Sequence, residues 1–248
     1  LMKRPGPLPA QKAMNVFVWD LRYPDAKNIE IGNNALISGS LIGPVAKPGK
    51  YTARMYQKDS LLASIDFTIL KDPRISTTDE DFKMQFDLLK KIRDKQTELN
   101  SAINTLRTIV KAVNDQSAAT KDTAVIARLK LVSAPMLDSL KKIEEELTQP
   151  KAVTDYDLFN YPNKLNDKLA GLHDIVAAAD ARPTNSCFMV YDDLSEKIDR
   201  QLKKMDDILN ARLPELNSII EKFQLYNIDR AILRGDIIIN FSLIPLNA

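Results

Sequence analysis

A heptad repeat in the first half of the chain constrains its fold more than any other feature. Mostly apolar residues recur every seven positions in two series offset by three: Phe82, Leu89, Gln96, Ile103 and Val110, and Gln85, Ile92, Leu99, Leu106 and Val113. A 3–4 spacing held this long predicts a long straight helix with one buried seam. Gln85 and Gln96 lie on that seam, so we expect part of it to stay hydrated or to meet a polar partner.

The helix follows a turn at Lys71–Arg74, and Thr77 or Thr78 is its expected N-cap. Three more amphipathic segments follow, at about residues 123–147, 163–179 and 186–223, the first containing Pro135 and the last Pro214 as expected breaks or kinks. Amphipathic segments on short connections predict an up-down four-helix bundle over residues 76–226.

The residues before the turn have the pattern of short strands. Val16–Leu21 is rich in β-branched and aromatic residues, while Tyr51–Tyr56 and Ile65–Ile69 alternate apolar with polar residues. Turn residues such as Pro48-Gly49 separate these segments. The pattern predicts a small β-sandwich, of the immunoglobulin or fibronectin kind, over residues 15–72. The expected fold class is therefore α+β.

Both ends of the chain differ from these two regions. Prolines and glycines crowd residues 1–14, as in a linker that follows a missing upstream domain, so we expect the chain to be part of a longer protein. The tail, residues 227–248, contains the strand-like run Ile237–Ile244, which could add an edge to the N-terminal sheet.

Composition excludes several functions. The 248 residues contain Lys+Arg 35 against Asp+Glu 33 and no basic block, which argues against nucleic-acid binding. No apolar run is long enough to span a membrane. The single Cys187 excludes an internal disulfide and a cysteine zinc site, and His173 has no Gly-x-Ser-x-Gly nucleophile motif to serve. We predict no cofactor, and structural roles for both residues.

Three stretches carry a resemblance when taken together. They are Asn15–Pro24, Pro48–Arg54 continuing to Lys71–Arg74, and Tyr161–Leu169 with Asp180–Thr184. Their order and spacing resemble the C-terminal region of large exported bacterial proteins with sortilin-like, sialidase-type (BNR) repeat propellers, often described as glycosyl hydrolases. The resemblance implies an upstream propeller in the same protein and export to the periplasm, cell surface or medium. It places any hydrolase site on the propeller and supplies no catalytic residue here.

A structural junction is the preferred interpretation of the residues on either side of the predicted sheet. Arg22 or Arg74 is expected to form a fork with a carboxylate and so fix the sheet relative to the helices. Asp20 and Asp72 could also pair as glycosidase carboxylates, but any chain with Asp+Glu 33 offers such pairs. The junction candidates are Trp19, Asp20, Arg22, Asp72, Pro73 and Arg74.

Three aromatic residues share one loop, Tyr156, Phe159 and Tyr161. They could stack on a sugar ring, although covering the end of the bundle is the preferred interpretation. The sequence thus favours a non-catalytic accessory region that braces a propeller or mediates association with a partner or a second copy. A carbohydrate-binding module is the alternative, and a free-standing enzyme is a third, more distant one.

Overall fold

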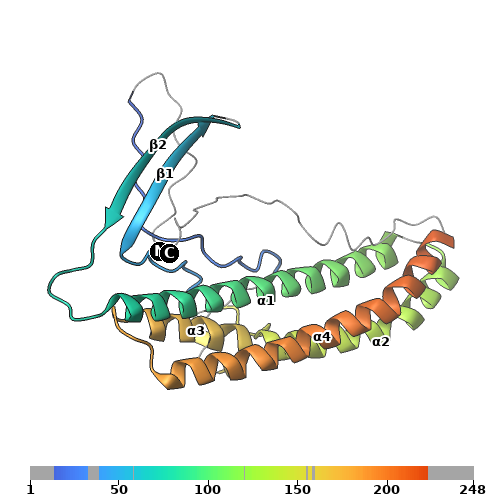
Figure 1. Ribbon diagram of the computed structural model, residues 1–248. Helices are drawn as coiled ribbons and strands as arrows, with labels where there is room; N and C mark the ends of the chain where they lie inside the picture. Colours follow the sequence, from blue (N-terminus) through green and yellow to red (C-terminus); the bar gives the residue numbers. More distant parts are fainter. Residues whose placement is uncertain are drawn as a thin grey trace.

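The computed structural model describes residues 14–32, 39–57, 59–119, 121–154, 156–157 and 160–222. Figure 1 shows their elements in chain order, strands β1 (Gly49–Gln57) and β2 (Ser60–Ile69) and helices α1 (Asp79–Ala119), α2 (Thr123–Leu147), α3 (Leu165–Ala177) and α4 (Asn185–Lys222). The predicted tail strand Ile237–Ile244 and all of the predicted linker except Met14 lie outside the described residues.

Helix α1 is the element that the heptad predicts. Thr78 and Asp81 form a capping box at its start, because the Thr78 hydroxyl accepts from the Asp81 N–H and the Asp81 carboxylate accepts from the Thr78 N–H. That carboxylate is held mainly by the Thr78 side chain, which lowers the pKa of Asp81. Every position of the two heptad series is buried except Val110, which is partly buried. The seam is therefore covered along the whole helix.

The helices form a bundle of three columns, which corrects the predicted four-helix up-down arrangement (Figure 1). Helices α2 and α3 run in the same direction, one after the other, and both pack between α1 and α4 while barely touching each other. The 25 residues of α2 and the 13 of α3 together match the 38 residues of α4. At about 1.5 Å per residue, α3 alone is too short to form a full-length column.

Polar contacts set the directions of these columns. Gln85, near the start of α1, donates to the carbonyls of Val176 and Ala179 at the end of α3 at 2.8 and 2.6 Å. The bond to Val176 satisfies a carbonyl group in the last turn of α3, which explains a glutamine on the buried seam, while the Ala179 carbonyl beyond the helix also accepts from the Ala181 N–H. Lys95 of α1 pairs with Asp199 of α4 at 2.8 Å, so α4 lies parallel to α1.

Pro135 and Pro214 lie within continuous helices, so neither splits its helix as predicted. The neighbouring Met136 is 1 % exposed in the bundle core, where packing offsets the one missing backbone hydrogen bond. Among the described residues, no helix combines the length and apolar character required to cross a bilayer. This agrees with the absence of a membrane span predicted from the sequence.

The predicted β-sandwich is wrong, and so is the α+β fold class, because the described residues are mostly helical with one small hairpin. The described residues contain one antiparallel two-stranded hairpin, β1–β2, and neither strand packs against a helix. The expected strand Val16–Leu21 does not join this sheet. Its continuation instead pairs back on itself, with Tyr23 N bonded to Pro44 O, Ala26 N to Leu41 O and Ala46 N to Leu21 O at 2.7–2.9 Å. A side chain at Gly43 would place its Cβ 1.9 Å from Tyr23 O, so only glycine permits this pairing.

Candidate interaction surface

An aromatic cluster joins the hairpin to the rest of the molecule. The Trp19 ring lies 6.2 Å from Tyr51 and 6.2 Å from Phe67 in edge-to-face contacts, and Tyr51 stacks on Phe67 at 5.8 Å. Tyr23 in turn contacts Phe86 of α1 at 4.9 Å. Such pairs stabilise by about 0.5–1.5 kcal/mol each beyond the area that they bury. The hairpin is thus attached through rings of the described residues that precede β1 (14–32 and 39–48), which we call the N-terminal segment.

The hydroxyl groups of this cluster are also engaged. Tyr51 donates to the Lys47 carbonyl at 2.7 Å. Burial, together with the neighbouring Tyr23, raises the pKa of Tyr51 to about 12. Burial also raises the pKa of Tyr23, and its hydrogen bond with Tyr51 opposes that effect. Both rings therefore strongly favour the neutral hydroxyl.

Three of the predicted junction residues lie together in a tight turn beside this cluster. The Asp20 carboxylate accepts from the Arg22 N–H at 3.0 Å, and Trp19 Nε1 donates to the Arg22 carbonyl at 2.9 Å. Leu21 between them has φ 61, a left-handed conformation that these bonds hold in place. The Arg22 guanidinium donates to the Gly43 carbonyl at 3.0 Å, so it binds main chain and not a carboxylate.

The other junction residues form a local contact. Arg74 makes a two-pronged bond with Asp72, its Nε 2.9 Å from Oδ1 and its Nη2 2.6 Å from Oδ2. The hydrogen bonds from Arg74 lower the pKa of Asp72, and those same bonds raise the pKa of Arg74. The Arg74 side chain is 87 % exposed, and the partners lie two residues apart on either side of Pro73. The fork therefore shapes the turn and does not connect the sheet to the helices.

Neither the predicted carboxylate pair nor the aromatic loop brings side chains together around a place where a ligand could bind. Asp20 and Asp72 are each bound to their own local partner, Arg22 or Arg74. In the loop, Tyr156 is 81 % exposed and Tyr161 is half-buried, while Phe159 lies outside the described residues. Asp157 between them accepts from the N–H groups of Thr154 and Val153, which lowers its pKa.

A ladder of polar side chains on α1, which the sequence reasoning did not find, holds the N-terminal segment. Its rungs recur at spacings of three and four and donate to, or accept from, the main chain of residues 24–31. They are Arg93, Thr97, Asn100, Asn104 and Arg107. Beneath the ladder Ala26 and Ile29 are buried, at 8 % and 5 % exposed. Helix α1 therefore carries two stripes, an apolar one for the bundle and a polar one for this segment.

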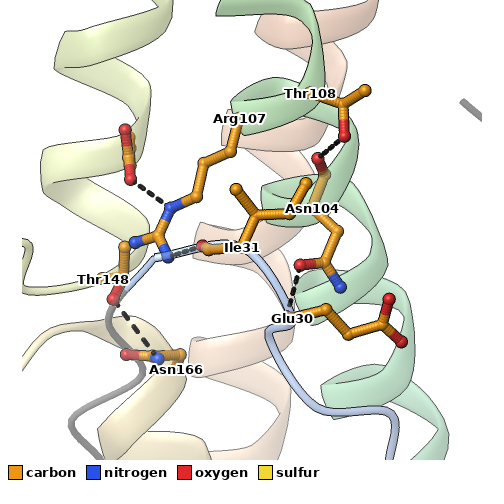
Figure 2. Close-up of polar contacts among 8 residues, drawn as sticks. Glu30, Ile31, Asn104, Arg107, Thr108, Thr148 and Asn166 are labelled. Atoms are coloured by element: carbon orange, nitrogen blue, oxygen red, sulfur yellow. Dashed lines mark hydrogen bonds and ion pairs between the residues drawn. The ribbon is translucent and has the colours of Figure 1, made fainter. Parts of the chain in front are cut away.

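Figure 2 shows the far end of the ladder. Asn104 Oδ1 accepts from the Glu30 N–H at 2.8 Å. Its Nδ2 also donates to the Asn28 carbonyl at 3.0 Å. Arg107 Nη1 donates to the Ile31 carbonyl, while its Nε binds Glu144 of α2 at 2.7 Å. The Arg107 and Glu144 side chains are only 10 % and 17 % exposed. One guanidinium thus ties together α1, α2 and the N-terminal segment.

His173 lies in a crevice between α1, α3 and the N-terminal segment. Its ring is buried, with Nδ1 3.0 Å from the Asp174 carboxylate. His173 Nε2 and Gln96 Oε1 are both buried without a hydrogen bond among the described residues. The crevice is too narrow to hold even a water molecule, so it offers no room for a ligand. Within the described ranges, no cluster of three or more His, Cys, Asp or Glu side chains could hold a metal ion.

The hairpin presents an apolar surface that no helix covers among the described residues. One of its faces consists of Tyr51, Ala53, Met55, Ala63, Ile65 and Phe67, paired across the strands, and we call it the apolar hairpin face. Trp19 covers its Tyr51–Phe67 end only. At the other end Met55 is 48 % exposed and Ile65 is 68 % exposed. An apolar sheet face without a covering layer is typical of a surface that binds another protein.

Comparison of the chain with protein-family models, with curated proteins and with solved structures finds no match. Its function is therefore inferred from the hairpin surface and from the way that the aromatic cluster and the ladder position it.

Proposed function

We propose that this chain is a non-catalytic accessory region that mediates association through the apolar hairpin face. The observation that carries the proposal is the exposure of Met55 and Ile65 on a strand pair that no helix covers. An isolated two-stranded hairpin is only marginally stable in water, and a covering layer would stabilise it. The rigid bundle then serves as the support that holds this surface in a fixed orientation.

The attachment of the hairpin supports this role. The Trp19 and Tyr23 rings connect it to α1 by way of the N-terminal segment. The ladder fixes that segment with bonds to main-chain atoms, and the buried side chains of Ala26 and Ile29 add apolar packing. A surface held at two places on a straight helix loses little conformational entropy when a partner binds.

The resemblance noted above indicates which partner to consider first. It implies that the chain follows a sialidase-type propeller in an exported protein, and an adjacent propeller would be a natural covering layer. Bracing that propeller and binding a separate protein partner are two versions of the same proposal. The carbohydrate-binding alternative finds less support, because of its two described aromatic candidates Tyr156 is 81 % exposed and Tyr161 is half-buried.

Photo-crosslinking from single positions, carried out in cells that produce the full-length protein, tests the proposal. A photoreactive amino acid is placed at Met55 or at Ile65 of the full-length protein, and at Leu131 as a matched control. Leu131 is an apolar residue of α2 that is 76 % exposed, so it reports random encounters. We expect discrete protein adducts, within the same polypeptide or with another, from both hairpin positions and not from Leu131.

Adducts of equal yield at all three positions would contradict a docking role for the hairpin. Binding of glycans to the isolated chain, measured by calorimetry, would instead favour the carbohydrate-binding alternative. In that case Tyr156→Ala should remove the heat of binding, whereas Met55→Ala should not.

A further inference from the structure

The two outer edges of the hairpin are protected to different degrees. Strand β1 begins after Pro48 and carries Lys50 and Arg54, and charged residues of this kind discourage pairing at an edge. Strand β2 has no proline and no basic residue, and its one charge, Asp66, is hydrogen-bonded to Thr52 at 2.7 Å. Among the described residues β2 pairs with β1 alone. In the part of the chain that the structure describes, the β2 edge is therefore open to another strand.

The sequence of β2 complements itself when two copies pair antiparallel about Ile65. In that register Ile65 lies opposite Ile65 of the other copy, Ala63 lies opposite Phe67, and Ser64 lies opposite Asp66. Each large ring thus faces a small side chain, and each carboxylate faces a hydroxyl group. Shifting the register so that Asp66 opposes Asp66 would place like charges together, which destabilises a pair of strands.

The bulge in β2 limits the length of this pairing. Met55 pairs with Ala63 and Tyr56 with Leu61, so Leu62 is the extra residue that interrupts the regular strand. Regular pairing with another copy is therefore confined to Ala63–Phe67, because Thr68 would lie opposite the bulged Leu62. This short contact fits a reversible association more than a permanent one.

We propose that two copies of this chain associate through their β2 edges, forming a four-stranded antiparallel sheet in the order β1-β2-β2-β1. This inference rests on the proposed role of the hairpin as a docking element, and it names the partner at one edge. The contact is isologous, since the same residues of both copies meet around a two-fold axis at Ile65. The β1 strands, with Lys50 and Arg54, then form the outer edges, so assembly stops at a dimer.

Edge pairing does not cover the apolar hairpin face. A two-fold axis perpendicular to the sheet keeps the Met55 and Ile65 side chains of both copies on the same side. The dimer doubles the width of that face and leaves it free for the partner of the proposed function. The two roles of the hairpin can therefore be tested separately.

Sedimentation of the purified full chain over a wide concentration range is the first test. We expect a monomer–dimer equilibrium without larger species. Ile65→Lys places two positive charges together at the axis, and it should weaken dimerisation at least about tenfold. Met55→Lys is the matched control, because it alters the same face on β1, away from the axis, and should leave the dimerisation constant unchanged.

Cysteine crosslinking shows which β2 residues of the two copies lie opposite each other, whatever the strength of the dimer. In a Cys187→Ser background, Ile65→Cys should form an interchain disulfide, because directly opposite Cβ atoms lie about 4.5–5.5 Å apart. Met55→Cys should not, since about three strand spacings, or roughly 14 Å, separate the two β1 strands of the dimer. Circular dichroism confirms that each variant remains folded.

A chain that stays monomeric at every concentration would overturn the β2–β2 dimer. This would be the result, for example, if residues 237–244 of the same chain paired with the β2 edge. A dimer that survives Ile65→Lys and does not crosslink at position 65 would also overturn it. Neither result affects the proposed function, which is tested by the photo-adducts at Met55, because Met55 lies on β1, away from the dimer axis. Larger oligomers would show that the β1 edge is not protected.

Discussion

The bundle and the hairpin differ in what becomes of their apolar residues. In the bundle, the seam of α1 finds its partners within the chain, and Leu99, Ile103 and Leu106 are 0 % exposed. In the hairpin, an equally regular alternation leaves Met55 and Ile65 exposed. Both patterns follow their secondary structure, with periods of 3.5 and 2. The described part of the chain buries the apolar residues of the helical pattern and leaves those of the strand pattern uncovered.

This difference separates residues that stabilise the fold from residues that are available for association. Burying a leucine side chain contributes about 1.5–3 kcal/mol, and the seam contains several. A side chain that remains exposed contributes little until a partner covers it. Stability and binding should therefore respond to substitutions in different regions of the molecule.

The largest expected contrast comes from a matched pair of truncations. Leu106→Ala should lower the free energy of unfolding by about 2–5 kcal/mol, because it leaves a cavity in the bundle core. Ile65→Ala should change it by less than about 0.5 kcal/mol, because this side chain is mostly in solvent. Urea denaturation of both variants at low protein concentration, where association is negligible, measures the two values. Equal losses would show that the hairpin face is covered in the monomer.

An intermediate effect is expected where the ladder holds the N-terminal segment. Asn104→Ala removes two hydrogen bonds to the segment, to Asn28 O and from Glu30 N, and should cost about 1–2 kcal/mol. Amide hydrogen exchange should rise in residues 24–31 and not in α4. Asn114→Ala, at an exposed position of the same helix, is the control. Unchanged exchange at residues 24–31 would exclude the ladder as their main attachment.

A smaller effect, limited to alkaline solution, is expected at the aromatic cluster. The pKa of Tyr51 in the folded protein, about 12, lies above the ordinary tyrosine value of 10.0. The folded state binds this proton more tightly, so the contribution is complete below pH 10 and is lost as the pH rises toward 12. Melting temperatures should fall over this window, and less steeply in Tyr51→Phe. Absorbance of ionised tyrosine should show one late-titrating group that this variant lacks.

The smallest effect is expected at the turn between sheet and bundle. Arg74→Ala breaks an exposed fork that lies entirely within the turn, so the melting temperature should change little. A fork that fixed the sheet relative to the helices, as predicted from the sequence, would give a larger loss. A clear drop in the melting curve would mean that the turn controls how the hairpin joins α1. Lys83→Ala, in an exposed pair with Asp87, is the control.

The helices were predictable because their signals are local. Thr78 and Asp81 mark the start of α1, and the heptad shows which side of this helix is buried. The predicted range 123–147 coincides with α2. The division into three columns was not predictable. It depends on α3 continuing in the direction of α2 across residues 148–164, and no local pattern distinguishes that path from a reversal.

The hairpin and its attachment were only partly predictable. Alternation identified β1 and β2, but it cannot show whether a second sheet exists to cover them. The ladder gives a weak signal, since Asn100 and Asn104 replace the lysines and glutamates usual on a solvated helix face. Short amides reach the main chain of a neighbouring segment, yet the sequence does not say which segment lies there. Trp19 was predicted at the junction, although as part of a strand.

The interrupted middle column has a consequence for how the molecule opens. Since α2 and α3 barely touch, each can separate from α1 and α4 without disturbing the other. Helix α3 also holds the N-terminal segment, through Ser40 bonded to Asp174 at 2.9 Å and Gly39 packed against Ala170. We therefore expect α3 and the segment that it holds to open locally while α2 stays packed on α1 and α4, as measured by amide hydrogen exchange.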